Sequence, residues 1–183
     1  MKAQTPDSQP MVTDNEVLEL ARTAFQHARA GETAHLGRLL EAGLPANLTN
    51  ERGDTLLMLS SYLGHEETTR VLLKHGADSE RLNDRGQTPL AGAAFKGNLA
   101  IARLLLDHGT RVDGTGPDGK TALMFAAMFD RKDVLELLVA YGAEPERKDT
   151  DGRTALDYAR AMGARGTAER LEKLRGTREQ RAS

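Results

Sequence analysis

Cysteine is absent from this 183-residue chain, and its absence excludes several kinds of chemistry. Without thiols the protein forms no disulfide, binds no metal through thiolates and uses no cysteine nucleophile. This composition fits a reducing compartment, so we expect a cytoplasmic protein. The chain also lacks an apolar segment near its start and any apolar run long enough to cross a bilayer. We therefore expect neither a secretory signal nor a membrane partner.

An excess of charge of one sign is also missing. The chain has 25 lysines and arginines against 27 aspartates and glutamates, which gives a formal net charge of −2. A chain so close to neutral has no general attraction for nucleic acid. We therefore expect the partner to be another protein, and we expect the chain itself to be a monomer.

Glycine, in contrast, is plentiful and regularly spaced. One series of glycines recurs every 33 residues, and a threonine follows each of them two positions later: Gly53, Gly86, Gly119 and Gly152, with Thr55, Thr88, Thr121 and Thr154. A second glycine series keeps the same step further along: Gly43, Gly76, Gly109 and Gly142. A period of this length indicates one supersecondary unit stacked on copies of itself.

The unit over residues 83–115 also carries a family resemblance. Its marker residues are Thr88-Pro89-Leu90, Ala93-Ala94, Gly97-Asn98, Leu104-Leu105-Leu106 and His108-Gly109. This pattern resembles the ankyrin repeat, and the resemblance extends over roughly residues 23–174. It implies an all-α solenoid of about five 33-residue helix-turn-helix units joined by β-hairpin-like turns.

The repeat register divides the chain into segments. Polar residues 1–12 predict a disordered segment, and Thr13 with Glu16 has the spacing of a helix capping box. The ankyrin-repeat domain is expected over 13–174, with an N-terminal capping repeat over 13–49, full repeats over 50–82, 83–115 and 116–148, a C-terminal capping repeat over 149–174, and a frayed basic tail over 175–183. Terminal repeats need one polar outer face, which explains their atypical sequences.

One segment matches a phosphate-binding motif. Residues 114–121 read Gly-x-x-x-x-Gly-Lys-Thr, but such a loop has to leave a buried strand and enter a long helix. No apolar strand precedes this segment, and the repeat register already explains Gly119 and Thr121. Lys120 stands at a position that varies between repeats. We therefore expect no nucleotide binding here and no nucleotide-dependent enzyme.

The histidines also suggest metal binding at first sight. They are His27, His35, His65, His75 and His108. His75 and His108 occupy one position in successive units, and packed helices lie about 8–10 Å apart. Two nitrogens that bind one zinc ion lie only about 2.0–2.1 Å from it, so these equivalents are too far apart. We interpret them as helix-end residues favoured by the helix dipole, and we expect no metal site, no cofactor, no catalytic residues and no enzymatic activity.

The surface remains as the candidate functional region. The resemblance implies that the turn tips and the exposed side of each first helix line a concave face. The repeat register places these residues there: Arg52, Asp54, Tyr62, Leu63, Arg85, Gln87, Phe95, Lys96, Asp118, Lys120, Met128, Phe129, Asp151 and Arg153. Aromatic, methionine and arginine side chains dominate the energy of protein interfaces. The alternative is that Tyr62, Phe95 and Phe129 only pack on one another between repeats.

These observations favour a non-enzymatic module that binds a partner protein through its concave face. Two more specific roles stay open. Residues 48–59 and 83–93 are similar to small bacterial ankyrin proteins, some of which are linked to catalases, and this resemblance implies an accessory role in peroxide defence or haem supply. The other role is that of an immunity-type inhibitor, which blocks a protein effector through the same face.

Overall fold

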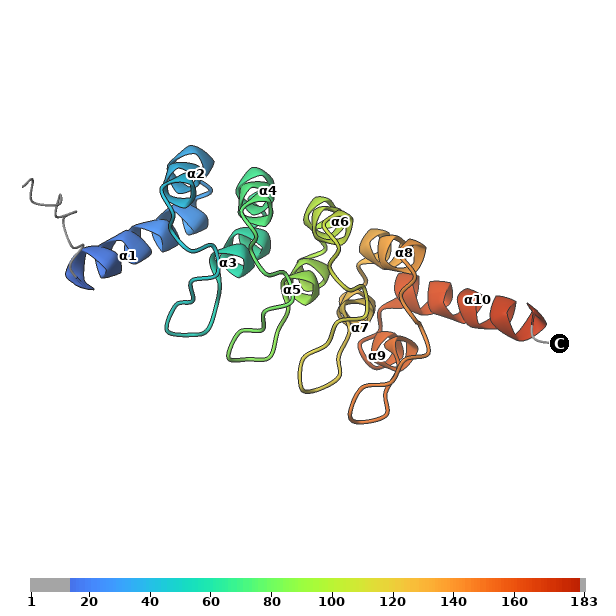
Figure 1. Cartoon of the computed structure of the whole chain (residues 1–183). Coiled ribbons are helices and arrows are strands. Elements are labelled where there is room, and N and C mark those ends of the chain that lie inside the picture. The colour runs from blue at the N-terminus through green and yellow to red at the C-terminus, as the bar shows by residue number, and fades with distance from the viewer. Residues whose placement is uncertain (1–13, 182–183) are drawn as a thin grey trace, which may run out of the picture.

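The computed structural model describes residues 14–181, and over this range the chain is an elongated stack of helices without strands. The helices are α1 Asp14–Ala30, α2 Thr33–Glu41, α3 Leu56–Leu63, α4 Glu66–Lys74, α5 Pro89–Lys96, α6 Leu99–Asp107, α7 Ala122–Met128, α8 Lys132–Ala140, α9 Ala155–Ala161 and α10 Arg165–Arg181. Odd-numbered helices α1 to α9 form one row and even-numbered helices α2 to α8 form another (Figure 1). The expected all-α repeat solenoid is therefore confirmed. The expected disordered segment 1–12 and Thr13 lie outside the described residues.

The repeated threonines mark helix starts. Each of them is the N-cap of an odd-numbered helix, and its hydroxyl accepts a hydrogen bond from the backbone N–H three residues on: Thr55 from Met58, Thr88 from Ala91, Thr121 from Met124 and Thr154 from Asp157. Such a bond satisfies one of the free N–H groups in the first helical turn. The threonines thus recur every 33 residues because each repeat begins its first helix with the same capping interaction.

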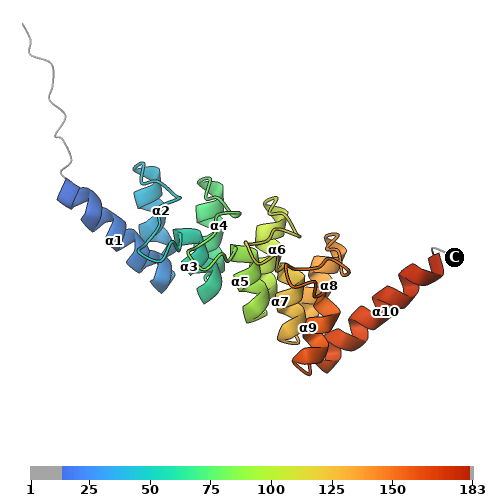
Figure 2. The same ribbon diagram turned by 90° about the horizontal axis from the view of Figure 1, so that it is seen from below.

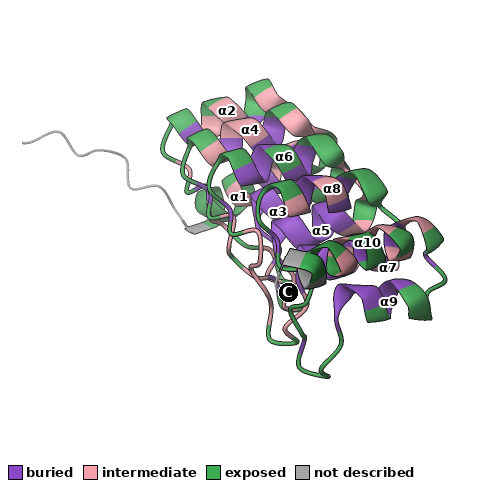
Figure 3. Ribbon diagram, turned by 90° about the vertical axis from the view of Figure 1, so that its right-hand side faces the viewer, coloured by how far each residue is buried: buried purple, intermediate pink, exposed green. Residues whose placement is uncertain are grey.

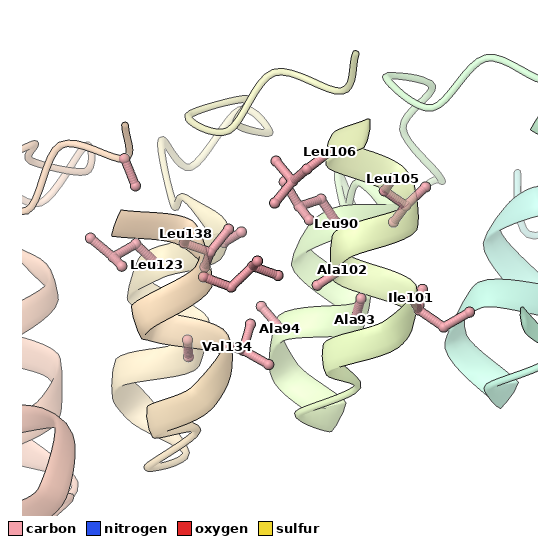
Figure 4. Close-up of a cluster of buried hydrophobic side chains, with 14 of the residues drawn as sticks. Leu90, Ala93, Ala94, Ile101, Ala102, Leu105, Leu106, Leu123, Val134 and Leu138 are labelled. Atoms are coloured by element: carbon pink, nitrogen blue, oxygen red, sulfur yellow. The ribbon is translucent and has the colours of Figure 1, made fainter. Parts of the chain in front are cut away.

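Leucines and alanines of successive helix pairs form one continuous core. Figure 4 shows Leu90, Leu105, Leu123 and Leu138 between neighbouring repeats, and the last three are fully buried. Each buried leucine contributes about 1.5–3 kcal/mol. In Figure 3 the buried positions face the space between the two rows, and the outer sides of the helices are exposed. No repeat buries this surface alone, so stability depends on stacking.

Finger-like turns connect consecutive helix pairs and project from one side of the stack (Figure 1). We number these fingers from the first, between α2 and α3, through the second, between α4 and α5, and the third, between α6 and α7, to the fourth, between α8 and α9. In three of them an Asn or Asp side chain accepts two backbone N–H groups, those of Arg52 and Asp54 at Asn50, Arg85 and Gln87 at Asn83, and Asp151 and Arg153 at Asp149. Neighbouring fingers are also joined, since Asp84 N–H donates to the Arg52 carbonyl at 3.1 Å. An isolated antiparallel bridge joins Thr49 and Thr55. The fingers are therefore a hydrogen-bonded scaffold.

The two terminal helices are longer than the helices between them. Helices α1 and α10 have 17 residues each and extend outward from the stack (Figure 2). Helix α10 continues to Arg181, so residues 175–181 of the expected basic tail are helical. Leu171 is buried and Leu174 packs against the core, which anchors the first half of α10. Within residues 14–181 no helix is long and apolar enough to cross a membrane.

Candidate protein-binding surface

Three aromatic rings from consecutive repeats lie side by side at the ends of the odd-numbered helices. We call Tyr62 of α3, Phe95 of α5 and Phe129 at the C-cap of α7 the aromatic ladder. The Tyr62 and Phe95 rings are stacked with centroids 6.3 Å apart, and the Phe95 and Phe129 rings meet edge to face at 4.5 Å. The repeat register produces this ladder, because it returns each helix end to the same place one repeat further along.

The aromatic ladder is only partly covered. Tyr62 is 41% exposed and its neighbour Leu63 is 49% exposed, while Phe95, Met128 and Phe129 are half-buried. The rings contact one another, as the packing alternative expects, but they also leave an apolar edge open to solvent. The aromatic ladder therefore shows the ring-to-ring contacts of the packing alternative and also the exposed apolar surface that a protein-binding site requires.

A shallow pocket separates the aromatic ladder from the second finger. It has a volume of about 180 Å³, and its lining includes Tyr62, Arg85, Gln87, Phe95 and Phe125. Lys96 places its ammonium group 5.0 Å from the centre of the Tyr62 ring, a cation–π distance. This surface therefore presents apolar rings with cationic groups at its border.

A larger hollow of about 650 Å³ lies between α1 and the first finger. Apolar Leu18 and Phe25 line it together with Arg29 and Arg52. The repeat register does not predict this hollow, because it indicates only a capping role for the first helix. The available signal was the apolar group at the start of α1, whose members Val17, Leu18 and Leu20 are 52%, 55% and 42% exposed.

Charged groups of the last two fingers are engaged with one another. The Lys120 ammonium donates to Asp118 at 2.9 Å and lies 5.9 Å from the centre of the Tyr158 ring, with the Arg153 guanidinium at 5.8 Å. Burial by itself raises the pKa of Asp118, but the hydrogen bonds from Lys120 outweigh it and lower that pKa. The bond to Asp118 raises the pKa of Lys120. Both groups are therefore charged at neutral pH.

The remaining candidates differ in their accessibility. Arg52, Arg85 and Asp151 are exposed on the fingers, and within residues 14–181 neither arginine has an ion pair. Asp54 is only 6% exposed, because its carboxylate accepts a hydrogen bond of 2.8 Å from the Asn83 side chain. This carboxylate therefore joins two fingers, and a role of Asp54 in binding a partner stays a prediction.

The segment that matched the phosphate-binding motif is the third finger. Residues 114–121 lead into α7, which has only seven residues, and the Lys120 ammonium is paired with Asp118. Gly116 allows close contact with the second finger, because a Cβ atom there would lie 1.9 Å from the Gly86 carbonyl oxygen. Gly116 and Lys120 thus have roles within the stack.

Stacked helix pairs with projecting fingers define the class of helical repeat solenoids. The family described as "Ankyrin repeats (3 copies)" matches residues 24–116 and 111–176, and the chain belongs to this family. Ankyrin repeats are generally protein–protein interaction modules and generally non-enzymatic.

One similar protein comes from Pseudomonas aeruginosa, where it is named as the ankyrin repeat protein PA3287. The two are 48% identical over 65 residues, which are 36% of this chain and 38% of the relative. This chain therefore spans well under half the length of that relative. Its name mentions neither catalase nor haem, so the accessory role in peroxide defence stays a prediction.

Proposed function

We propose that this protein is a non-enzymatic adaptor that binds one partner protein through its concave face. The observation that carries the proposal is the partly exposed aromatic ladder beside Arg85, which forms no ion pair with the residues that the structure describes. A contiguous apolar strip on the surface of a folded protein marks an interaction site more often than chance. Tyrosine and arginine are also the residue types enriched among the side chains that contribute most to binding.

Rigidity supports the same proposal. The fingers are held by backbone hydrogen bonds and by Asn and Asp side chains, as at Asn83. The rings of the aromatic ladder are held by contacts with each other. A partner therefore meets a preorganised surface and loses little conformational entropy of this chain on binding.

The charges indicate what kind of partner fits. Arg52 and Arg85 stand exposed at the first two finger tips, and Lys96 borders the ladder. A protein segment that combines apolar side chains with carboxylates complements this surface. The exposed tips of the last two fingers carry Asp118 and Asp151 instead, so a polyanion such as nucleic acid is a poor match along the whole face. An inhibitor of a protein effector is one form of this proposal.

The test is recovery of the partner from a lysate of the native host, followed by binding measurements with the purified partner. Wild type is compared with Phe95→Asp/Phe129→Asp. Since these two rings are half-buried, a second variant, Tyr62→Glu/Leu63→Glu, changes only exposed side chains. Circular dichroism first establishes that each variant is folded. We expect both variants to lose the same protein and to bind it at least tenfold more weakly.

A control variant places one carboxylate, where each concave-face variant has two, in the other row of helices. Leu99→Asp changes a residue at the start of α6 that is 36% exposed, and α6 belongs to the row of even-numbered helices (Figure 1). We expect this variant to retain the partner. Equal recovery by wild type and by both concave-face variants would exclude the concave surface as the binding site. Light scattering of the purified chain tests the expected monomer.

A further inference from the structure

Two histidines and one glutamate converge at the turn between α1 and α2. His27 lies in the last turn of α1, Glu32 precedes α2 as its N-cap, and His35 lies in the first turn of α2. The Nδ1 atom of His27 is 2.5 Å from Oε2 of Glu32, and Nδ1 of His35 is 3.9 Å from the same oxygen. One ligand atom from each residue lies within 4.8 Å of the other two.

The backbone of this turn holds the three side chains on one side. Glu32 N–H donates to the His27 carbonyl at 3.0 Å, and Leu36 N–H donates to the Glu32 carbonyl at 3.1 Å. Although Glu32 occupies the N-cap position, its side chain makes no capping hydrogen bond. Its carboxylate instead faces the imidazole of His27, and the two imidazole rings are stacked with centroids 5.1 Å apart.

We propose that His27, Glu32 and His35 bind a divalent transition-metal ion of the zinc type. Two imidazole nitrogens and one carboxylate oxygen suit zinc, cobalt and nickel, whereas calcium and magnesium prefer ligand sets made only of oxygen. Three protein ligands leave a fourth position for water or for a group of a bound partner. This site is independent of the concave-face proposal and contradicts the absence of a metal site expected from the sequence.

The present distances are compatible with such an ion after small side-chain movements. Ligand atoms about 2.0–2.2 Å from a tetrahedral zinc ion lie about 3.4 Å apart. The contact between His27 and Glu32 therefore lengthens by about 1 Å, and that between Glu32 and His35 shortens by about 0.5 Å. The side chains of Glu32 and His35 are 49% and 57% exposed, so both are free to make these movements.

Binding has a structural consequence that is measurable without a partner. The ion connects the end of α1 to the start of α2, and both helices belong to the first repeat, which packs against a neighbour on one side only within residues 14–181. A ligand that binds the folded chain and not the unfolded chain raises the melting temperature. The site therefore predicts stabilisation by zinc that depends on these three side chains.

The experiment uses the full chain without an affinity tag. Calorimetric titration with ZnCl₂ is expected to give one ion per chain with a dissociation constant on the order of micromolar, and CaCl₂ is expected to give no binding. The melting temperature, followed by circular dichroism, is expected to rise by several degrees when zinc is added. Cobalt provides a spectroscopic readout, because its visible absorption reports four-coordinate binding. Glu32→Gln and His35→Ala are each expected to weaken zinc binding at least tenfold.

The matched control is His75→Ala, which removes an exposed histidine at the C-cap of α4. We expect this variant to bind zinc as tightly as wild type. The proposal is overturned if wild type does not bind zinc at 100-fold above the expected constant, that is, on the order of 100 µM. It is also overturned if zinc binds wild type, Glu32→Gln and His35→Ala with equal affinity. That result would mean that zinc binds elsewhere and that His27 and Glu32 form only an ion pair.

Discussion

Replacing Gly116 by alanine tests how closely the second and third fingers approach each other. A Cβ atom at Gly116 would lie 1.9 Å from the Gly86 carbonyl oxygen and 3.0 Å from its carbonyl carbon. Gly116 is not among the glycines with positive φ, so alanine suffers no conformational strain of its own. The cost of the substitution therefore comes from the contact alone.

The expected cost follows from the movement that alanine requires. Restoring an ordinary separation of about 3.4 Å moves one finger by more than 1 Å, and overpacking of this kind costs about 1–3 kcal/mol. The matched substitution is Gly37→Ala in the interior of α2, where the new Cβ atom would lie 3.8 Å from Val71 Cγ1 in ordinary contact. Glycine inside a helix costs about 0.5–1 kcal/mol relative to alanine, so Gly37→Ala should stabilise the protein.

Urea unfolding followed by circular dichroism measures both effects. We expect the unfolding midpoint to fall for Gly116→Ala and to rise for Gly37→Ala, with little change in the slope of the transition. If Gly116→Ala is as stable as wild type, the fingers are not packed as closely as the structure shows. If Gly37→Ala lowers the free energy of unfolding by more than about 1 kcal/mol, α2 packs more closely against α4 than the structure shows.

Three further substitutions test the core, a cap and a surface ion pair. Leu123→Ala empties a fully buried position and should cost about 2–5 kcal/mol in chemical denaturation; a loss below 1 kcal/mol contradicts the central role of this core. The pKa of Asp157 is lowered, chiefly because the Thr154 backbone N–H donates a hydrogen bond to its carboxylate. The charged carboxylate therefore stabilises the fold above the ordinary pKa of 3.8, and this stabilisation is lost as the pH falls through the lower pKa of the folded state. The stability difference between wild type and Asp157→Asn should therefore shrink between pH 6 and pH 3, and a constant difference refutes the assignment. Arg170→Ala breaks the bidentate pair with Glu136 and should cost no more than about 1 kcal/mol, less at high salt; a larger, salt-independent loss points to packing instead.

The parts of the fold that the sequence predicts are those that rest on local interactions. Thr88 caps α5 through a bond to Ala91 N–H, three residues away, and the same spacing recurs in every full repeat. Asp130 replaces a glycine at the end of α7 and adopts a positive φ of 53°, as the repeat register requires. Because each repeat encodes its own start and turn, one period in the sequence predicts the whole stack.

The missed features depend on neighbours that a single repeat does not reveal. Asp54 is buried because Asn83 of the next finger donates to it, and no spacing within one repeat indicates this. The repeat register does not predict the histidine cluster, because it relates residues of different repeats, whereas His27 and His35 belong to one terminal repeat. Helix α10 continues past Gly176 because its second half contains no proline. Arg175, Arg178, Glu179 and Gln180 are good helix formers.

The fingers separate the residues that build the scaffold from those that can select a partner. Four candidates share one position in the register: Asp54, Gln87, Lys120 and Arg153. Asp54 and Gln87 each accept a hydrogen bond from the Asn83 side chain, and Lys120 forms an ion pair with Asp118. The Arg153 guanidinium lies beside the Tyr158 ring. The position two residues earlier holds Arg52, Arg85, Asp118 and Asp151, and all four are exposed. Changes at the first position should therefore alter stability together with binding. Because Arg52 and Arg85 have no ion pair within residues 14–181, exchanging them for glutamate should alter the choice of partner while leaving the stack intact.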